Sequence, residues 1–295
     1  MSDFVIMTDS SCDLPQHTAD ELGVVVLPLA ITTQDGSVYR NYLDGREISF
    51  EDFYTRLRSG EHITTSAVNM GEFIEAMEPV LGQGKDILVL AFSSGLSTTC
   101  NSAVLAAKEM EEKYPGRRVV VVDTLAASLG QGLLVYLTAK KARLEGLTLE
   151  EAADFAEGIK LKCIHWFTVA DLDQLKRGGR ISPTTAVVGN LLGIKPVLFV
   201  DDAGHLIQKF KVKGRQASLK KMAELMKEHF DNESPDQAVF ISHGDCMDDV
   251  AYLEEQIRTV TGYEGEILVN YVGPVIASHS GAGTMALFFV GDARE

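Results

Sequence analysis

Short apolar runs alternate with amphipathic stretches in the first half of the chain, which predicts strands that alternate with helices. Strands are predicted at Phe4–Thr8, Val24–Ile31, Ile87–Phe92 and Arg118–Asp123. Helices are predicted at Glu47–Arg58, Met70–Leu81, Thr98–Lys113, Leu125–Leu144 and Leu149–Ile159, and Pro15 suits the first turn of another. This order implies a parallel sheet with helices on both faces.

The second half has the pattern of a mixed α+β domain. Strands are predicted at Cys163–Val169, Lys195–Val200, Leu206–Lys213, Gln237–Ser242 and Gly265–Asn270, and helices at Asp171–Lys176, Gln216–Phe230 and Met247–Thr259. The turn Asp201–Gly204 joins two of these strands into an antiparallel hairpin. We therefore predict an α/β fold of two domains, with an N-terminal parallel-sheet domain at 1–160 and a C-terminal mixed domain at 161–295.

Composition narrows the function classes. The 295 residues carry 27 Lys+Arg against 42 Asp+Glu, a net charge of 27 − 42 = −15, which argues against a nucleic acid partner and disfavours general adhesion to an anionic membrane. The four cysteines form no C-x-x-C pair, and no His/Cys/Asp cluster has metal spacing, so we expect reduced thiols, no metal and no cofactor. Without a leader-like N-terminus or an apolar run near the roughly 20 residues of a membrane helix, we expect a cytoplasmic protein.

One stretch reverses the overall charge. Residues 176–221 carry ten Lys/Arg and two acids, Asp201 and Asp202, a local balance of 10 − 2 = +8. Such a stretch is either a solvated face or a docking surface for an anionic partner or a phosphate.

Polar turns follow several predicted strands, at the edge where an open α/β sheet binds its ligands. They are Thr8–Asp13, Ser93–Thr99 and Asp123–Ser128, and a further hydroxyl cluster at Thr64–Ser66 precedes a helix. Each hydroxyl alone is explained by helix capping, but several at one edge favour an anion site. The turns contain no P-loop, nucleophile elbow or dinucleotide fingerprint.

The histidines allow two interpretations. His279, in a glycine-rich segment, is either a structural hydrogen-bonding group or a polar group beside a ligand, and His243 is a weaker candidate of the same kind. His165 and Trp166 lie in an apolar stretch and are predicted to be core residues.

Seven segments in register resemble the DegV family over residues 3–290. They are Thr8–Pro15, Thr65–Ser66, Ser93–Thr99, Asp123–Thr124, Asp171–Leu172 with Leu175–Ser182, Gly189–Pro196 and His279–Gly283. The resemblance implies two α/β domains that hold one long-chain fatty acid, such as palmitate, between them. It also implies similarity to the fatty-acid-binding subunit of the bacterial fatty acid kinase, which presents its carboxylate to a separate kinase catalytic subunit for acyl-phosphate formation. Transient membrane contact is compatible with that role.

The resemblance also assigns roles to residues. Thr65 and Ser97 would hold the carboxylate, helped by Ser93 or Ser94 and by His279. Arg180 and Lys213, which stands where the family commonly has arginine, would lie on the surface that docks the partner.

Three functions remain open at this point. The first is a lipid carrier without catalytic residues of its own. The second is a small-molecule enzyme, for phosphotransfer or hydrolysis, that uses Ser97 or His279. The third is an interaction module with an incidental lipid.

Overall fold

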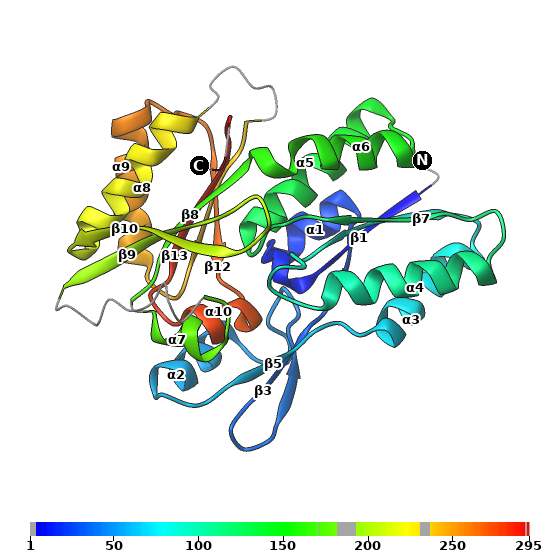
Figure 1. Cartoon of the computed structure of the whole chain (residues 1–295), viewed down its shortest axis with the longest axis horizontal. Coiled ribbons are helices and arrows are strands. Elements are labelled where there is room, and N and C mark those ends of the chain that lie inside the picture. The colour runs from blue at the N-terminus through cyan, green and yellow to red at the C-terminus, as the bar shows by residue number, and fades with distance from the viewer. Residues whose placement is uncertain (1–3, 171, 182–192, 231–236, 293, 295) are drawn as a thin grey trace.

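The computed structural model describes residues 4–170, 172–181, 193–230, 237–292 and 294. Within these residues it shows a parallel-sheet domain and a mixed-sheet domain, which confirms the predicted fold class (Figure 1). Asp171, Ser182 and residues 189–192 of the family segments lie outside the described residues, and the boundary at residue 160 remains a prediction.

The first sheet is parallel throughout, with the strand order β2-β1-β6-β7. These strands are β1 (Phe4–Asp9), β2 (Val25–Leu27), β6 (Asp86–Ala91) and β7 (Val119–Asp123). Leu88 and Leu90 of β6 belong to one core with α1 (Gln16–Leu22), α5 (Leu129–Glu145) and α6 (Leu149–Ile159). Ile87 and Val89 belong to another core with α3 (Met70–Gly82) and α4 (Thr99–Lys113). Helices therefore cover both faces, as predicted.

The second sheet has the order β10-β9-β8-β13-β11-β12, and of these neighbours only β11 and β12 are parallel. Its strands are β8 (Cys163–Thr168), β9 (Ile194–Val200), β10 (Leu206–Lys213), β11 (Val239–His243), β12 (Ile267–Tyr271) and β13 (Met285–Val290). Helices α8 (Arg215–His229) and α9 (Met247–Thr261) pack on one face (Figure 1). The other face turns toward α5 and the first domain.

The predicted strand Val24–Ile31 is wrong, because the segment divides between two sheets. Val25–Leu27 pairs with β1, whereas β3 (Ala30–Thr32) pairs with β4 (Val38–Arg40) and β5 (Thr64–Ser66) in a small antiparallel sheet that the sequence pattern did not predict. Pro28 lacks a backbone N–H, and the N–H of Leu29 donates to Ser10 Oγ at 3.0 Å instead of to a neighbouring strand.

Two helices begin three or more residues later than predicted. Helix α5 starts at Leu129 rather than Leu125, because Leu125 and Ser128 have positive φ angles of 50° and 54°. Helix α2 (Phe50–Arg58) starts after Ser49, whose Oγ accepts a hydrogen bond from the Asp52 N–H at 3.0 Å. Three further short helices are η1 (Ser10–Cys12), η2 (Lys160–Lys162) and α7 (Asp173–Arg177).

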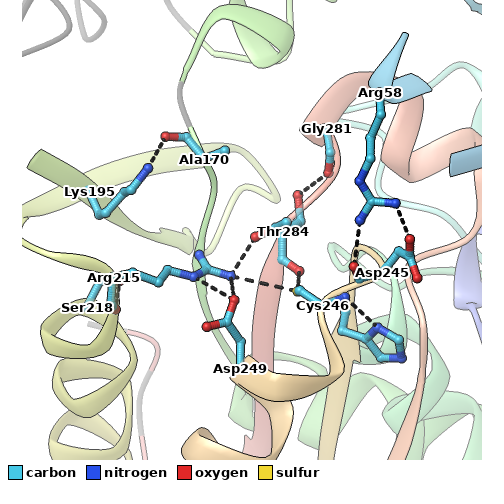
Figure 2. A network of polar contacts seen from close by, with 12 residues as sticks. Arg58, Ala170, Lys195, Arg215, Ser218, Asp245, Cys246, Asp249, Gly281 and Thr284 are labelled. Atoms are coloured by element: carbon cyan, nitrogen blue, oxygen red, sulfur yellow. Dashed lines mark hydrogen bonds and ion pairs between the residues drawn. The ribbon is translucent and has the colours of Figure 1, made fainter. Parts of the chain in front are cut away.

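The C-terminal segment contains two elements that were not predicted, α10 (Pro274–Ser280) and the central strand β13. Two hydrogen bonds hold the loop between them: Arg215 Nη2 donates to Gly283 O at 2.6 Å, and Thr284 Oγ1 donates to Gly281 O at 2.7 Å. Figure 2 shows Arg215, Thr284 and Gly281 in this network. Arg215 is in turn paired with Asp249 of α9 at 2.9 Å. Across the described residues, no helix combines the length and apolar character needed to cross a membrane.

Candidate functional site

A cavity of about 450 Å³ lies between the two sheets, within the size range of small-molecule sites. Its apolar wall on the mixed sheet includes Phe167 of β8, Val200 of β9 and Phe288 of β13. The opposite wall includes Leu29, Phe92 and Leu96 from the first domain. The cavity therefore suits a ligand with a substantial apolar part.

Thr65 and His279 form a polar pair in the cavity wall. Thr65 lies on β5 and His279 on α10, 214 positions apart in the sequence, and the distance from Thr65 Oγ1 to His279 Nε2 is 2.8 Å. The tautomer with its proton on Nε2 donates to the threonine and leaves the threonine hydroxyl hydrogen for a ligand acceptor. The pair can then offer a hydrogen bond to a carboxylate.

Burial lowers the pKa of His279 to about 4, and the positive charge of Arg180 acts in the same direction. The imidazole is therefore neutral at neutral pH. Arg180 Nε donates to Leu96 O at 3.3 Å, and its Nη1 donates to Gly178 O. Its guanidinium, half-buried in the cavity wall, supplies the positive charge at this site.

The serines of the Ser93–Thr99 turn are not equivalent. Ser94 and Ser97 line the cavity. Ser97 Oγ accepts from the Thr99 N–H at 3.2 Å, at the start of α4, and lies 2.9 Å from Thr99 Oγ1. Ser93 is fully buried beneath the turn, is not a lining residue, and donates from Oγ to Gly204 O in the β9–β10 hairpin at 3.0 Å. The structure thus brings together Thr65, Ser94, Ser97 and His279, while the Ser93 hydroxyl joins the two domains.

The two residues predicted to dock a partner lie in different surroundings. Arg180 lines the cavity beside His279, whereas Lys213 is exposed at the end of β10 and is not a lining residue. Several cations of the 176–221 stretch have structural partners, such as Lys195, whose Nζ donates to Ala170 O at 2.8 Å (Figure 2). The basic stretch is therefore not one uniform free surface.

Both predicted core residues on β8 are buried, at 2% exposure for His165 and 1% for Trp166. His165 also lines the cavity, which was not predicted from the sequence. Its Nδ1 lies 2.9 Å from Cys163 O, and burial lowers its pKa well below the ordinary value, so it is a neutral part of the wall.

A second polar group of lining residues was also missed. Ser128 and Ser242 line the cavity with their hydroxyl oxygens 3.0 Å apart, and Ser128 Oγ donates to Asp13 Oδ2 at 2.6 Å. Asp13 follows β1 in the first polar turn, so the turn pattern located it without showing its partners. Among the described residues, no group of three or more His, Cys, Asp or Glu side chains is placed to hold a metal ion.

The family model of the uncharacterised DegV proteins matches residues 3–292. The chain belongs to the DegV family. A DegV domain-containing protein of Clostridium perfringens is 45% identical over 295 residues, which is 100% of both chains. A DegV domain-containing protein of Streptococcus pyogenes is 36% identical over 98% of each chain.

Solved structures of other DegV proteins share this architecture. A fatty-acid-binding DegV family protein from Thermus thermophilus has a TM-score of 0.87 and 33% identity, covering 98% of this chain and 99% of its own. A protein from Thermotoga maritima, described as revealing a fatty acid binding function, has a TM-score of 0.82 and 28% identity, with coverage of 99% and 100%. These structural neighbours bind fatty acids.

Proposed function

We propose that this DegV family protein carries one long-chain fatty acid in the cavity between its sheets. The observation that carries the proposal is an apolar cavity of about 450 Å³ with the Thr65–His279 pair, Ser97 and Arg180 in its wall. The related structures from Thermus and Thermotoga, described as fatty acid binding, support it.

The energetics suit this ligand. Each CH₂ group that is buried contributes about 0.8 kcal/mol to binding. A tail of about sixteen carbons, such as that of palmitate, therefore gains roughly 12 kcal/mol in binding free energy before ordering costs are subtracted. The carboxylate then needs hydrogen-bond donors and a positive charge, since an unpaired buried charge would cancel much of this gain. Thr65 and Ser97 supply hydroxyl donors, Ser94 lies at the same turn, and Arg180 supplies the charge.

The same site supports presentation of the carboxylate to the catalytic subunit of a fatty acid kinase, in the cytoplasm. A carboxylate is already ionised at neutral pH, so its attack on a phosphate needs no base from this chain. Arg180 and Lys213 would face that partner. Reversing the charge of Lys213, which lies outside the cavity lining, should abolish kinase coupling while lipid stays bound, and unchanged coupling would contradict its docking role. Reversing the charge of Arg180 should weaken lipid binding as well, because Arg180 also serves the carboxylate.

The alternative, an enzyme that uses Ser97 or His279, has less support. Among the described residues, the hydrogen bond of the His279 ring goes to Thr65, and the Ser97 hydroxyl is engaged with Thr99. A histidine with its pKa lowered to about 4 is also a weak base at neutral pH. Within the described residues, the His279 ring therefore contacts the Thr65 hydroxyl and not Ser97, so the Ser97–His279 contact of such an enzyme is not formed.

Native mass spectrometry of the purified protein, compared with its denatured mass, tests the carrier function directly. We expect an excess mass of one fatty acid, identified after extraction. No excess, together with no uptake of added palmitate or oleate, would overturn the proposal and favour the enzyme.

Thr65→Val should weaken palmitate binding about tenfold. The substitution preserves shape but removes a hydroxyl that donates to a charged group, a loss of roughly 1.5 kcal/mol or more. The dissociation constant is measured by titration of delipidated protein. Thr64→Val, the same change one position earlier on β5, lies outside the cavity lining and should leave binding within twofold. Equal effects of the two variants would remove Thr65 from the carboxylate site.

A further inference from the structure

A polar side chain interrupts the apolar wall that the mixed sheet gives to the cavity. Ser242 of β11 is fully buried and is paired across the sheet with Ala286 of β13, which is paired in turn with Phe167 of β8. Directly paired residues of antiparallel strands lie on the same face of a sheet, and all three line the cavity. Phe288, two positions after Ala286 and on the same face, lines it as well. Ser242 therefore presents a hydroxyl where its neighbours on the sheet would contact an acyl tail.

The Ser242 hydroxyl ends a short chain of hydrogen bonds that starts at Asp13. Ser128 Oγ donates its only hydrogen to Asp13 Oδ2 at 2.6 Å, and the hydroxyl oxygens of Ser128 and Ser242 are 3.0 Å apart. Because the Ser128 hydrogen is used, Ser242 donates its own hydrogen to Ser128 and keeps a lone pair for a donor. If Asp13 is protonated and donates to Ser128 instead, the chain reverses and Ser242 has a free hydrogen. A hydroxyl on a ligand pairs with Ser242 in both states, because it both donates and accepts.

Charge distinguishes this group from the carboxylate site. Among the described residues that line the cavity, Arg180 is the one that carries a permanent charge, and that charge acts on His279. The carboxyl of Asp13, by contrast, lies directly behind Ser128. An ionised Asp13 would repel a carboxylate beside Ser242, whereas it would not repel a neutral oxygen. The carboxylate of a ligand therefore suits the Arg180 side of the cavity, and an uncharged oxygen substituent suits Ser242.

We propose that Ser242, held by Ser128 and Asp13, is a specificity-determining residue that binds a hydroxyl group on the acyl chain, so that hydroxylated long-chain fatty acids are a ligand class of this cavity. This inference rests on the proposed function. A tail of CH₂ groups alone would cover Ser242 and leave one of its hydrogen-bonding positions without a partner, which costs free energy. A tail hydroxyl placed elsewhere would be buried against apolar side chains such as Phe92 and Phe288, which is also unfavourable. The cavity should therefore discriminate between positional isomers.

The test measures dissociation constants on the delipidated full-length chain. The ligands are stearate and a series of monohydroxystearates that differ only in the position of the hydroxyl along the tail. One isomer, or two adjacent ones, should bind at least as tightly as stearate, and the others should bind roughly tenfold more weakly. Ser242→Ala should weaken binding of the preferred isomer about tenfold and leave stearate binding within twofold.

Ser280→Ala is the matched control. Ser280 also lines the cavity, and among the described residues its hydroxyl has no hydrogen-bond partner. Removing this hydroxyl should leave the dissociation constants of stearate and of the preferred isomer within twofold. A preference that Ser280→Ala removes and Ser242→Ala retains would overturn the inference, because the tail hydroxyl would then bind on α10.

The other outcomes separate the inference from the proposed function. If the wild-type chain binds stearate but prefers no isomer over the others, Ser242 does not recognise a tail hydroxyl, and the carrier function stands. This comparison needs no variant. If Ser242→Ala weakens stearate and the preferred isomer equally, Ser242 supports only the shape of the cavity and the inference is wrong. If the wild-type chain binds neither stearate nor any isomer, the carrier function is wrong and the inference falls with it.

Discussion

Gly178→Ala is expected to weaken fatty acid binding about 100-fold. Gly178 ends α7 with an ordinary right-handed backbone, φ −73°, so its conformation does not require glycine. Glycine is required because of the available space, since a Cβ at this position would lie 2.3 Å from His279 Nδ1. The imidazole must move, and it would lose its contact with Thr65. Losing the His279–Thr65 contact, and with it the oriented hydroxyl contact to the carboxylate, costs roughly 3 kcal/mol, which corresponds to about a 100-fold loss of affinity.

The matched control is Gly158→Ala in α6. Gly158 has no atom within 4 Å of a Cβ added to it, so alanine should leave palmitate binding unchanged and stabilise the helix by up to about 1 kcal/mol. Both variants are compared by palmitate titration and by thermal unfolding without ligand. Unchanged binding in a folded Gly178→Ala protein would show that the position of His279 does not determine affinity.

The regular elements were predictable because each carries its own local signal. The apolar run at 87–92 is a buried strand, and the helix that ends at Arg58 is amphipathic and capped. Two missed elements also carried signals. Pro274 at the first turn and Gly281 at the end mark α10, and the apolar segment Met285–Val290 has the same pattern as the strand at 87–92. In Val24–Ile31, Pro28 was a local signal against one continuous strand, whereas the hydrogen bond from the Leu29 N–H to Ser10, a residue distant in sequence, is a tertiary contact.

The site was predictable only in part. Thr65 and His279 are 214 positions apart, so no spacing rule pairs them, and the resemblance to the DegV family named both. Hydroxyl-rich turns indicated the sheet edge, yet they did not distinguish Ser97, which lines the cavity, from Ser93, which is bonded beneath it.

Asp13→Asn should remove a large pH dependence of stability between about pH 4 and 7. Burial raises the pKa of the Asp13 carboxyl to about 7, although the hydrogen bond from Ser128 lowers it in part. The unfolded carboxyl has a pKa near 3.8, so between these values the folded state holds a proton that the unfolded state has lost. The contribution of the Asp13 carboxyl to the free energy of unfolding is therefore at its full value below about pH 3.8 and is lost as the pH rises toward 7. The difference corresponds to roughly 4 kcal/mol in the free energy of unfolding.

Asparagine suits the position, because Asp13 has a left-handed backbone with φ 51°, a conformation that asparagine adopts readily, and its amide oxygen can still accept from Ser128. Urea unfolding at several pH values gives the free energy for both proteins. The wild-type chain should lose stability relative to Asp13→Asn across this range and run parallel to it above pH 7. Asp35→Asn is the control. Hydrogen bonds from Ser37 and Thr33 lower the pKa of the exposed Asp35 carboxyl to about 2, so the contribution of Asp35 to the free energy of unfolding changes only below pH 4. If the wild-type and Asp13→Asn curves stay parallel from pH 4 to 7, Asp13 is ionised in the folded protein and places a full negative charge behind Ser128 and Ser242 of the cavity wall.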